Sequence, residues 1–259
     1  MSEALVGAKA APGQAGAVRK FADWFPGVLA ECEKISKASR WYNLEKMTPE
    51  LAKIFVQQLS LWTRSAFKVR GHVIAICPHA DLRLTLMEVM GEEDVEDPRI
   101  GMNHRQLMAK SLGQASGQSI ADLEKVQPLP TTLLTFDTLF NIATRSWVEG
   151  VAFTSGTERV MRETGYFRLD AHRFQRDLGW SDEALAWFTD HDVADEEHGA
   201  LIEQLDKYIT DDTDWDRAEE ALLQSWTAWW IMLDGCLTAH EQGLKPVKGL
   251  TCKALSYYY

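Results

Sequence analysis

The sequence predicts an all-α fold, and three observations support this class. Apolar residues recur at helical spacing over most of the chain. Clusters of proline, glycine and aspartate separate these periodic segments. Only Val73–Cys77, with the sequence VIAIC, resembles a strand, and one short apolar run among helices is weak evidence for a sheet. With 259 residues, of which 46% are hydrophobic, the chain can bury a full core.

The clearest helix begins after Thr48. A threonine N-cap followed by Pro49 is a typical helix start, and apolar residues then recur at helical spacing as far as Val69. Six more segments have helical patterns, which brings the predicted number of helices to seven: 18–36, 79–91, 104–112, 131–164, 182–209 and 215–241. The breaks between them are Pro98, Gly113–Gly117, Pro128 with Pro130, Gly179, and the turn Asp211–Asp214.

We predict a single helical domain over residues 17–259, preceded by a disordered leader at 1–16. The first sixteen residues are rich in alanine and glycine and lack the sustained apolar core of a secretion signal. No Gly/Ser/Pro-rich linker divides the rest of the chain into halves. One domain is therefore preferred over two.

Charge and cysteine usage exclude several classes of partner. The formal net charge is −11 and no cluster of five or more lysines and arginines occurs, so we expect neither nucleic acid nor membrane as a partner. No segment reaches the roughly eighteen apolar residues that would span a bilayer. The cysteines form no Cys-x-x-Cys motif, which predicts reduced thiols in a cytoplasmic protein: Cys32, Cys77, Cys236 and Cys252.

Two imidazoles and a carboxylate share one face of the predicted helix over 182–209. At about 100° per residue, His191, Asp195 and His198 fall within roughly 60° of one another. A mixed set of imidazole and carboxylate ligands favours iron or manganese, and iron is our preference. The alternative is a solvated acidic helix face, because four more acidic residues crowd the same stretch.

One helix supplies only three ligands, so other helices must complete such a site. Glu158 follows a run of small and apolar residues, where a buried charge would need a partner or a metal. It could also lie at a solvated edge beside Arg159. Acidic residues that include Glu92 precede His104, and these side chains are further candidate ligands. The alternative is that this segment is an acidic surface turn.

Several well-known site motifs are absent from the sequence. The chain contains no Glu-x-x-His pair, which four-helix ferritin-like diiron proteins use twice. It also lacks the His-Glu-x-x-His of zinc proteases, a Gly-rich phosphate loop and a Gly-x-Ser-x-Gly nucleophile turn. These reaction classes are therefore disfavoured.

Taken together, three segments resemble a known helical family. They read VMGEEDV followed by MNHRQLM, then GVAFTSGTE, and finally AWFTDHDVADEEHGAL. The chain is similar over roughly residues 45–240 to the family that contains pyrroloquinoline-quinone synthase and thiaminase II. It most closely resembles the heme-oxygenase-like diiron oxidase and oxygenase branch, which includes the chlamydial-type p-aminobenzoate synthase. This resemblance implies a seven-helix heme-oxygenase-like bundle, two Fe2+ ions and O2 as co-substrate.

Carried over residue by residue, the resemblance implies six metal ligands: Glu92, His104, Glu158, His191, Asp195 and His198. The last three form the specific part of the motif. Pro98 and Gly101 lie between Glu92 and His104, so an unbroken helix cannot present both side chains. Glu93 would suit a continuous helix and Glu88 is a poorer choice, so the identity of the first carboxylate stays open.

The activity implied by the resemblance is that of a nonheme diiron oxidase or oxygenase in a biosynthetic pathway. Its substrate would be an amino acid, an amine or a fatty acid, and the reaction N-oxygenation, desaturation or oxidative C–C cleavage. An external electron donor and a homodimer are compatible with this activity.

Three alternatives to the diiron enzyme remain. A metal-free oxidase of the pyrroloquinoline-quinone synthase type would use His191, Asp195 and His198 for acid-base chemistry or substrate binding. A self-sacrificing p-aminobenzoate synthase is disfavoured, because Arg168 stands where these synthases have a lysine. An interaction protein that keeps the bundle would bind no metal.

Overall fold

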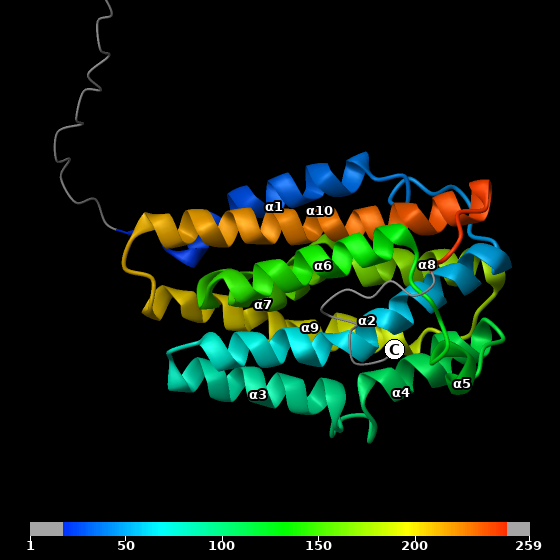
Figure 1. Cartoon of the computed structure of the whole chain (residues 1–259), viewed down its shortest axis with the longest axis horizontal. Coiled ribbons are helices and arrows are strands. Elements are labelled where there is room, and N and C mark those ends of the chain that lie inside the picture. The colour runs from blue at the N-terminus through cyan, green and yellow to red at the C-terminus, as the bar shows by residue number, and fades with distance from the viewer. Residues whose placement is uncertain (1–17, 248–259) are drawn as a thin grey trace, which may run out of the picture.

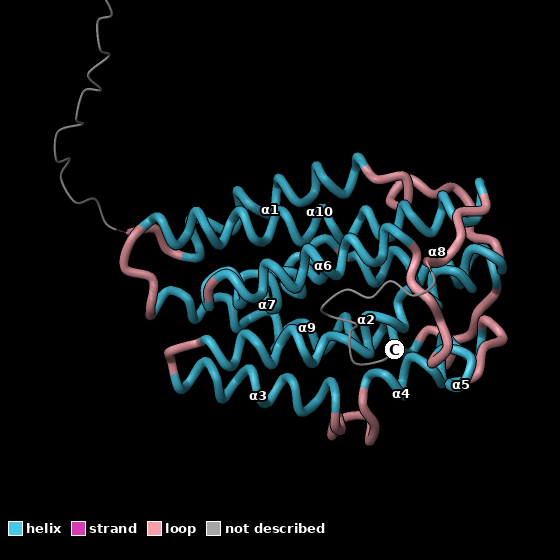
Figure 2. The backbone as a smooth tube through the Cα atoms, viewed as in Figure 1, coloured by secondary structure: helices cyan, strands magenta, loops and turns pink. Residues whose placement is uncertain are grey.

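The computed structural model describes residues 18–247 and confirms the all-α class (Figures 1 and 2). These residues contain no β-strand, only an isolated bridge between Asp97 and Met102. The α-helices are α1 Phe21–Ala38, α2 Pro49–Ile76, α3 Ala80–Asp94, α4 His104–Met108, α5 Ile120–Leu123, α6 Pro130–Arg145, α7 Trp147–Thr164, α8 Tyr166–Leu178, α9 Ala186–Ala200 and α10 Asp212–Gln242. A π-helix, Ala109–Gly113, follows α4, and a 3₁₀-helix, Leu201–Lys207, follows α9.

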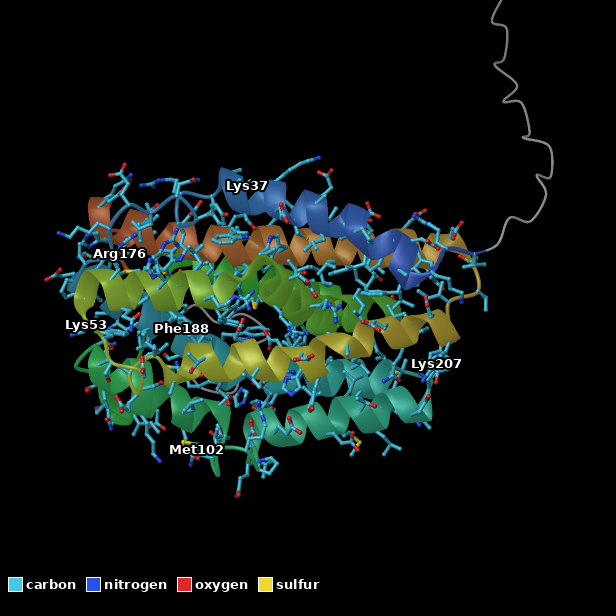
Figure 3. The ribbon with its side chains drawn as sticks, turned by 180° about the vertical axis from the view of Figure 1, so that it is seen from behind. Lys37, Lys53, Met102, Arg176, Phe188 and Lys207 are labelled. Atoms are coloured by element: carbon cyan, nitrogen blue, oxygen red, sulfur yellow. The ribbon has the colours of Figure 1, made fainter. Side chains whose placement is uncertain are left out.

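The long helices run side by side and enclose one buried apolar cluster (Figure 1). Helix α10 packs against α1, α2, α6 and α7, while α7 also packs against α6 and α9. Helix α3 lies against α2 at the edge of the bundle and leads into α4. Figure 3 shows Lys37 and Lys207 at the surface, whereas Phe188 is fully buried between the helices.

The prediction of one helix over 131–164 is wrong, because the chain breaks at Ser146. This residue has an extended backbone, with φ −154° and ψ 164°, and its side chain accepts a hydrogen bond from the backbone N–H of Glu149. A serine that caps α7 therefore separates it from α6 without a proline or glycine. The apolar pattern continues through this single-residue break, which hides it from a periodicity argument.

The C-terminal half contains two further departures from the predicted helices. Helix α8, between the left-handed glycines Gly165 and Gly179, was not predicted. The predicted helix 182–209 begins at Ala186, and after Ala200 it tightens into the 3₁₀-helix. The described residues thus hold ten α-helices rather than the seven predicted from spacing. The VIAIC segment forms the end of α2, as expected for a chain without a sheet.

The predicted leader at 1–16 lies outside the described residues. The boundaries of the single domain at 17–259 therefore stay a prediction. Within residues 18–247, no helix is both long enough and apolar enough to cross a membrane.

Small residues bring α7 and α9 close together. A Cβ atom placed on Gly199 of α9 would lie 2.9 Å from the backbone of Arg159 on α7. A Cβ on Gly156 of α7 would lie 2.7 Å from the side chain of Ile202. Gly199 therefore lets α9 approach the backbone of α7, Gly156 makes room for the 3₁₀-helix that follows α9, and this packing places Glu158 and His198 in one layer of the bundle.

We expect Gly199→Ala to lower the free energy of unfolding by about 1–3 kcal/mol, because its methyl group meets backbone rather than a movable side chain. Urea unfolding of the purified variant measures this change. The matched control is Gly27→Ala in α1, where no atom lies within 4 Å of the added Cβ. This control should stabilise the protein by about 0.5–1 kcal/mol through helix propensity. Equal effects at both positions would contradict the close packing of α7 on α9.

Candidate metal centre

Side chains from four helices meet between α3, α4, α7 and α9. Two groups of potential metal ligands lie at this point, and both contain Glu93 of α3. The first group adds His104 of α4 and His191 of α9. The second adds Glu158 of α7 and His198 of α9, and the donor atoms within each group lie within 4.8 Å of one another. Glu93 thus joins two neighbouring sets of ligands.

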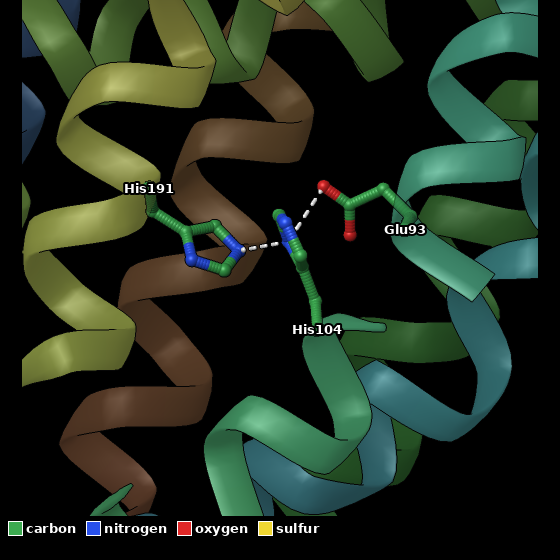
Figure 4. A group of neighbouring side chains, drawn as sticks. All are labelled: Glu93, His104 and His191. Carbon is green, nitrogen blue, oxygen red and sulfur yellow. Dashed lines mark hydrogen bonds and ion pairs between the residues drawn. The ribbon is translucent and has the colours of Figure 1, made fainter. Parts of the chain in front are cut away.

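The first group is a compact set of two imidazoles and one carboxylate (Figure 4). Nδ1 of His104 lies 3.0 Å from Oε1 of Glu93 and 3.1 Å from Nε2 of His191. Donor atoms about 3 Å apart span neighbouring positions around a metal whose bonds are about 2.1 Å long. His104 and His191 are both at least nine-tenths buried.

Each of the three histidines uses its outer ring nitrogen for a hydrogen bond. Nδ1 of His191 lies 2.8 Å from the carbonyl oxygen of Trp187, and Nε2 of His198 lies 2.9 Å from Oε2 of Glu92. Nε2 of His104 lies 3.3 Å from Oδ2 of Asp97. The other nitrogen of each ring faces Glu93 or a second histidine. This arrangement fixes the tautomer that a metal-ligating histidine needs.

Buried polar atoms without partners lie in and beside the second group. Asp195 is only 1% exposed, and neither of its carboxylate oxygens has a hydrogen-bond partner among the described residues. Nδ1 of His198 also lacks a hydrogen bond and lies 3.6 Å from Oε1 of Glu93. A buried carboxylate without a donor is costly, so a cation at this point would relieve the cost.

The structure places Glu93, rather than Glu92, at the centre of the predicted ligand set. Glu92 is 30% exposed in its side chain and belongs to neither group, and it contacts the outer nitrogen of His198. Helix α3 continues to Asp94, so the side chain of Glu93 is turned about 100° from that of Glu92 and faces inward. The expected break before His104 is present, with Gly101 at φ +64°. Four of the six predicted ligands belong to the two groups, Asp195 lies beside them in the wall of one cavity, and Glu93 stands where Glu92 was predicted.

Arg70 is a residue of the candidate centre that the sequence did not single out. Its guanidinium enters the site from α2 and is almost completely buried. Nη2 donates a 2.7 Å hydrogen bond to Oε1 of Glu158, and Nη1 lies 3.5 Å from Oε2 of Glu93. Each glutamate therefore turns one oxygen towards Arg70 and keeps the other for the centre. The only sequence signal is the position of Arg70 next to the apolar stripe that contains Val69 and Val73.

Burial and neighbouring charges shift the pKa values of the site in opposite directions. Burial lowers the pKa of His104, but the carboxylates of Glu93, Asp97 and Asp190 outweigh it and raise the pKa to about 9. Burial, together with the charge of His104, lowers the pKa of His191 to about 3, so His191 is neutral. Burial and the charge of Glu158 raise the pKa of Asp195 well above its usual range.

Glu93 is the carboxylate that stays ionised. Burial opposes its ionisation, but the charges of Arg70 and His104 outweigh burial and hold the pKa of Glu93 well below its usual range. An ionised glutamate at the junction of both ligand groups is the state that binds a cation. A cation that binds at Glu93 would have to displace the proton of His104, whose charge helps to keep Glu93 ionised.

A third cluster of acidic and imidazole groups surrounds the outer face of His104. Asp97 and Asp190 both lie 3.3 Å from its Nε2. Arg99 pairs with Asp97 and lies 3.6 Å from Oδ2 of Asp190, so its guanidinium already supplies the positive charge there. We assign this cluster to holding His104 in place rather than to a further metal.

The sequence of residues 53–231, more than half of the chain, matches the model of a family described as iron-containing redox enzymes. The chain belongs to this family. No curated protein matches the sequence significantly.

Three solved structures share the fold of this iron-containing redox enzyme. A domain of unknown function with a heme oxygenase-like fold from Shewanella denitrificans OS217 has a TM-score of 0.74 at 16% identity, and the match covers 91% of this chain and 100% of that one. A CADD-like protein of unknown function from Nostoc punctiforme PCC 73102 has a TM-score of 0.61 at 15% identity, with 81% and 97% covered. A TenA homolog from Pseudomonas syringae pv. tomato DC3000 has a TM-score of 0.63 at 13% identity, with 87% and 98% covered. These likenesses show the heme-oxygenase-like fold, in agreement with the resemblance of the sequence.

The residues at the centre fit the iron that the family name implies. The group of Glu93, His104 and His191 is a set of two histidines and one carboxylate, which suits nonheme iron. The unpartnered oxygens of Asp195 and the free Nδ1 of His198 are further nitrogen and oxygen donors of the kind that iron accepts. Iron prefers such mixed nitrogen and oxygen donors over purely thiolate or purely oxygen sets.

We expect Asp97→Asn to weaken metal binding by about 10–100-fold, because His104 loses the carboxylate that orients its ring. Titration of the metal-free protein with Fe2+ against a competing chelator, without oxygen, measures this affinity. Glu96→Gln is the matched control, since Glu96 is exposed and next to Asp97 in the sequence. Its affinity should equal that of the unchanged protein. The same loss in both variants would contradict the positioning role of Asp97.

Iron binding should release a proton from His104 at neutral pH. In the metal-free protein His104 is protonated below its pKa of about 9, and a ligating imidazole must be neutral. The apparent affinity for Fe2+ should therefore rise about tenfold per pH unit from pH 7 towards pH 9 and level off above it. Anaerobic titrations at pH 7, 8 and 9 measure this dependence. An affinity that falls with rising pH in this range would contradict the placement of His104 at the metal.

Proposed function

We propose that this chain is a nonheme diiron oxidase or oxygenase that uses O2 to oxidise a small organic molecule. The observation that carries this proposal is the orientation of the three histidines. Their inward nitrogens meet around Glu93, while their outward nitrogens are held by separate acceptors. The membership of the chain in an iron-containing redox enzyme family supports the choice of metal.

The two ligand groups support a division of the predicted ligands between two ions. Glu93, His104 and His191 would hold one iron, and Glu158 and His198, which also form a group with Glu93, would hold the other together with the unpartnered Asp195. The irons, when bound, supply the reduction of O2 and the oxidation of a molecule next to them. Arg70 orients the two glutamates by pairing with one oxygen of each. Trp187, through its carbonyl oxygen, keeps a proton on Nδ1 of His191 and leaves Nε2 free for the metal.

A narrow cavity next to this centre would receive the substrate. It holds about 60 Å³ of space, and Glu93, Glu158, His191 and Asp195 form part of its wall. The rest of the wall is mainly aromatic and aliphatic, with tryptophan and phenylalanine side chains from α2, α7, α8, α9 and α10. Such a wall excludes bulk water from the ligand groups and leaves a small organic molecule as the natural occupant.

The alternative of a self-sacrificing p-aminobenzoate synthase finds no support at Arg168. The guanidinium of Arg168 is 60% exposed and pairs with both carboxylate oxygens of Asp192 at 3.0 Å. It does not belong to the wall of the cavity. A small-molecule substrate, an external electron donor, a homodimer, a cytoplasmic location and the absence of nucleic-acid and membrane partners remain predictions.

A count of iron tests the proposed function. We expect anaerobic reconstitution to give about two Fe2+ per chain, because two adjacent ligand groups are present. Exposure to O2 should then give a transient absorbance and consume oxygen. Iron analysis and stopped-flow spectroscopy measure these outcomes.

His191→Ala and His198→Ala should each bind less iron than the unchanged protein. The matched control is His172→Ala, because His172 is an exposed histidine of α8 outside both groups. This variant should keep its iron. An iron count near zero in the folded, unchanged protein would overturn the diiron proposal and leave the metal-free alternative.

A further inference from the structure

A groove with a mainly apolar lining lies on the outer side of the bundle, between α2, α3 and the start of α4. It encloses about 540 Å³, and the side chains that line it include Phe67, Met87, Met90 and Val95. Met87 is 51% exposed and Val95 is 75% exposed. Exposed apolar side chains that gather in one concave surface often mark a place where another stretch of chain binds.

The same groove contains a buried acceptor without a donor. Asp94, at the end of α3, forms part of the groove wall. Its Oδ2 is buried and has no hydrogen-bond partner among the described residues. A buried oxygen without a donor is costly, so the occupant of the groove should bring an N–H or O–H group as well as apolar surface.

The described part of the chain ends close to this groove. The backbone N–H of Val247 donates a 2.9 Å hydrogen bond to the carbonyl oxygen of Pro128. In the stretch just before Pro128, the carbonyl oxygens of Glu124 and Val126 accept hydrogen bonds of 2.7 and 3.5 Å from the guanidinium of Arg64. Arg64 lines the groove. The loop that holds Val247 is thus tied to a side chain of the groove wall.

The residues that follow Val247 have the length and composition to fill the groove. Residues 248–259 lie outside the described part of the chain and read KGLTCKALSYYY. Twelve extended residues span about 40 Å, whereas neighbouring helices pack only about 8–10 Å apart. The segment offers two leucines and three tyrosines for apolar contact, and tyrosine rings pack well against methionine. It has two lysines and no acidic residue, which complements the exposed Glu88 and Glu96 beside the groove.

We propose that residues 248–259 bind in this groove, where their leucine and tyrosine side chains cover its apolar lining and a lysine or tyrosine donates a hydrogen bond to Asp94. Because the segment is tethered at Val247, its local concentration at the groove exceeds that of a free partner. Thr63 lines both the groove and the cavity beside the candidate metal centre. The bound segment therefore adds a layer outside the wall of that cavity. The inference does not depend on a bound metal or on the proposed function.

The rate of chymotrypsin cleavage within residues 250–259 of the full, metal-free chain tests the proposal. Mass spectrometry identifies the cut sites, and a synthetic peptide with the sequence of residues 248–259 gives the rate for a free segment. We expect cleavage in the chain to be at least about tenfold slower than in the peptide, because a bound segment must leave the groove before the protease can accept it. Equal rates in the chain and the peptide would overturn the proposal.

Three lysine variants of exposed apolar residues test whether the groove is the binding site. Met87→Lys and Val95→Lys each place a charge in the apolar lining and repel the lysines of the segment, so cleavage should rise to within about threefold of the peptide rate. Leu84→Lys is the matched control, because Leu84 is a 60% exposed residue of α3 outside the groove lining. Its cleavage should stay slow. Equal cleavage rates in Met87→Lys and Leu84→Lys would overturn the assignment to this groove.

Dilution separates the chain's own segment from that of a second copy. A tethered segment stays protected when the protein is diluted about a hundredfold, because its local concentration does not change. Protection that is lost on dilution would show that the groove binds the segment of another copy, which would overturn binding within one chain. Protection that persists on dilution and is lost in Met87→Lys would support the proposal.

Discussion

The interaction on which the rest of the structure depends is the pairing of Arg70 with Glu93 and Glu158. Three carboxylates, those of Glu93, Glu158 and Asp195, lie largely buried in the wall of one cavity, where an unpaired ion costs several kcal/mol. Arg70 offsets two of them from α2 and keeps Glu93 ionised. Asp195 has no such partner, and its pKa rises accordingly. In the metal-free protein, Arg70 therefore compensates the negative charges of Glu93 and Glu158, whereas no cation compensates Asp195.

The packing of α7 and α9 makes this concentration of charge geometrically possible. Gly199 allows α9 to lie directly on the backbone of Arg159, one residue after Glu158. His198 precedes Gly199, so the contact that needs a glycine also sets the distance between the second group's histidine and glutamate. Gly156 serves the same purpose one turn earlier on α7, where it accommodates Ile202. The small residues of the segment GVAFTSGTE thus allow close helix packing, while its glutamate, Glu158, is a candidate ligand.

The sequence predicted those parts of the fold and of the site that are periodic. The helical class, and the shared face of His191, Asp195 and His198, follow from spacing within one element and are confirmed as geometry. The break at Ser146 could not be predicted, because a single capping serine interrupts neither the apolar pattern nor the composition. The choice between Glu92 and Glu93 depended on where α3 ends and how the following turn packs, which are tertiary properties.

Arg70 illustrates a different limit of the sequence. An arginine beside an apolar stripe is usually exposed, because its long side chain can reach solvent from most positions. Only the arrangement of α3 and α7 against α2 shows that the side chain of Arg70 points inward and pairs with Glu93 and Glu158. Asp97 and Asp190 are similar cases, since their contact with the outer nitrogen of His104 depends on the turn between α3 and α4.

The atoms that lack hydrogen bonds distinguish this site from a network of ion pairs that serves only stability. In the metal-free protein, His104 carries a proton that lies between its Nδ1 and the acceptors Glu93 and His191. That proton and the guanidinium of Arg70 are the positive charges of the site. A network built for stability alone would also satisfy Asp195 and Nδ1 of His198, but both lack hydrogen bonds. In the proposed function, a metal ion would replace the proton at His104, and a second ion would use the free atoms of Asp195 and His198.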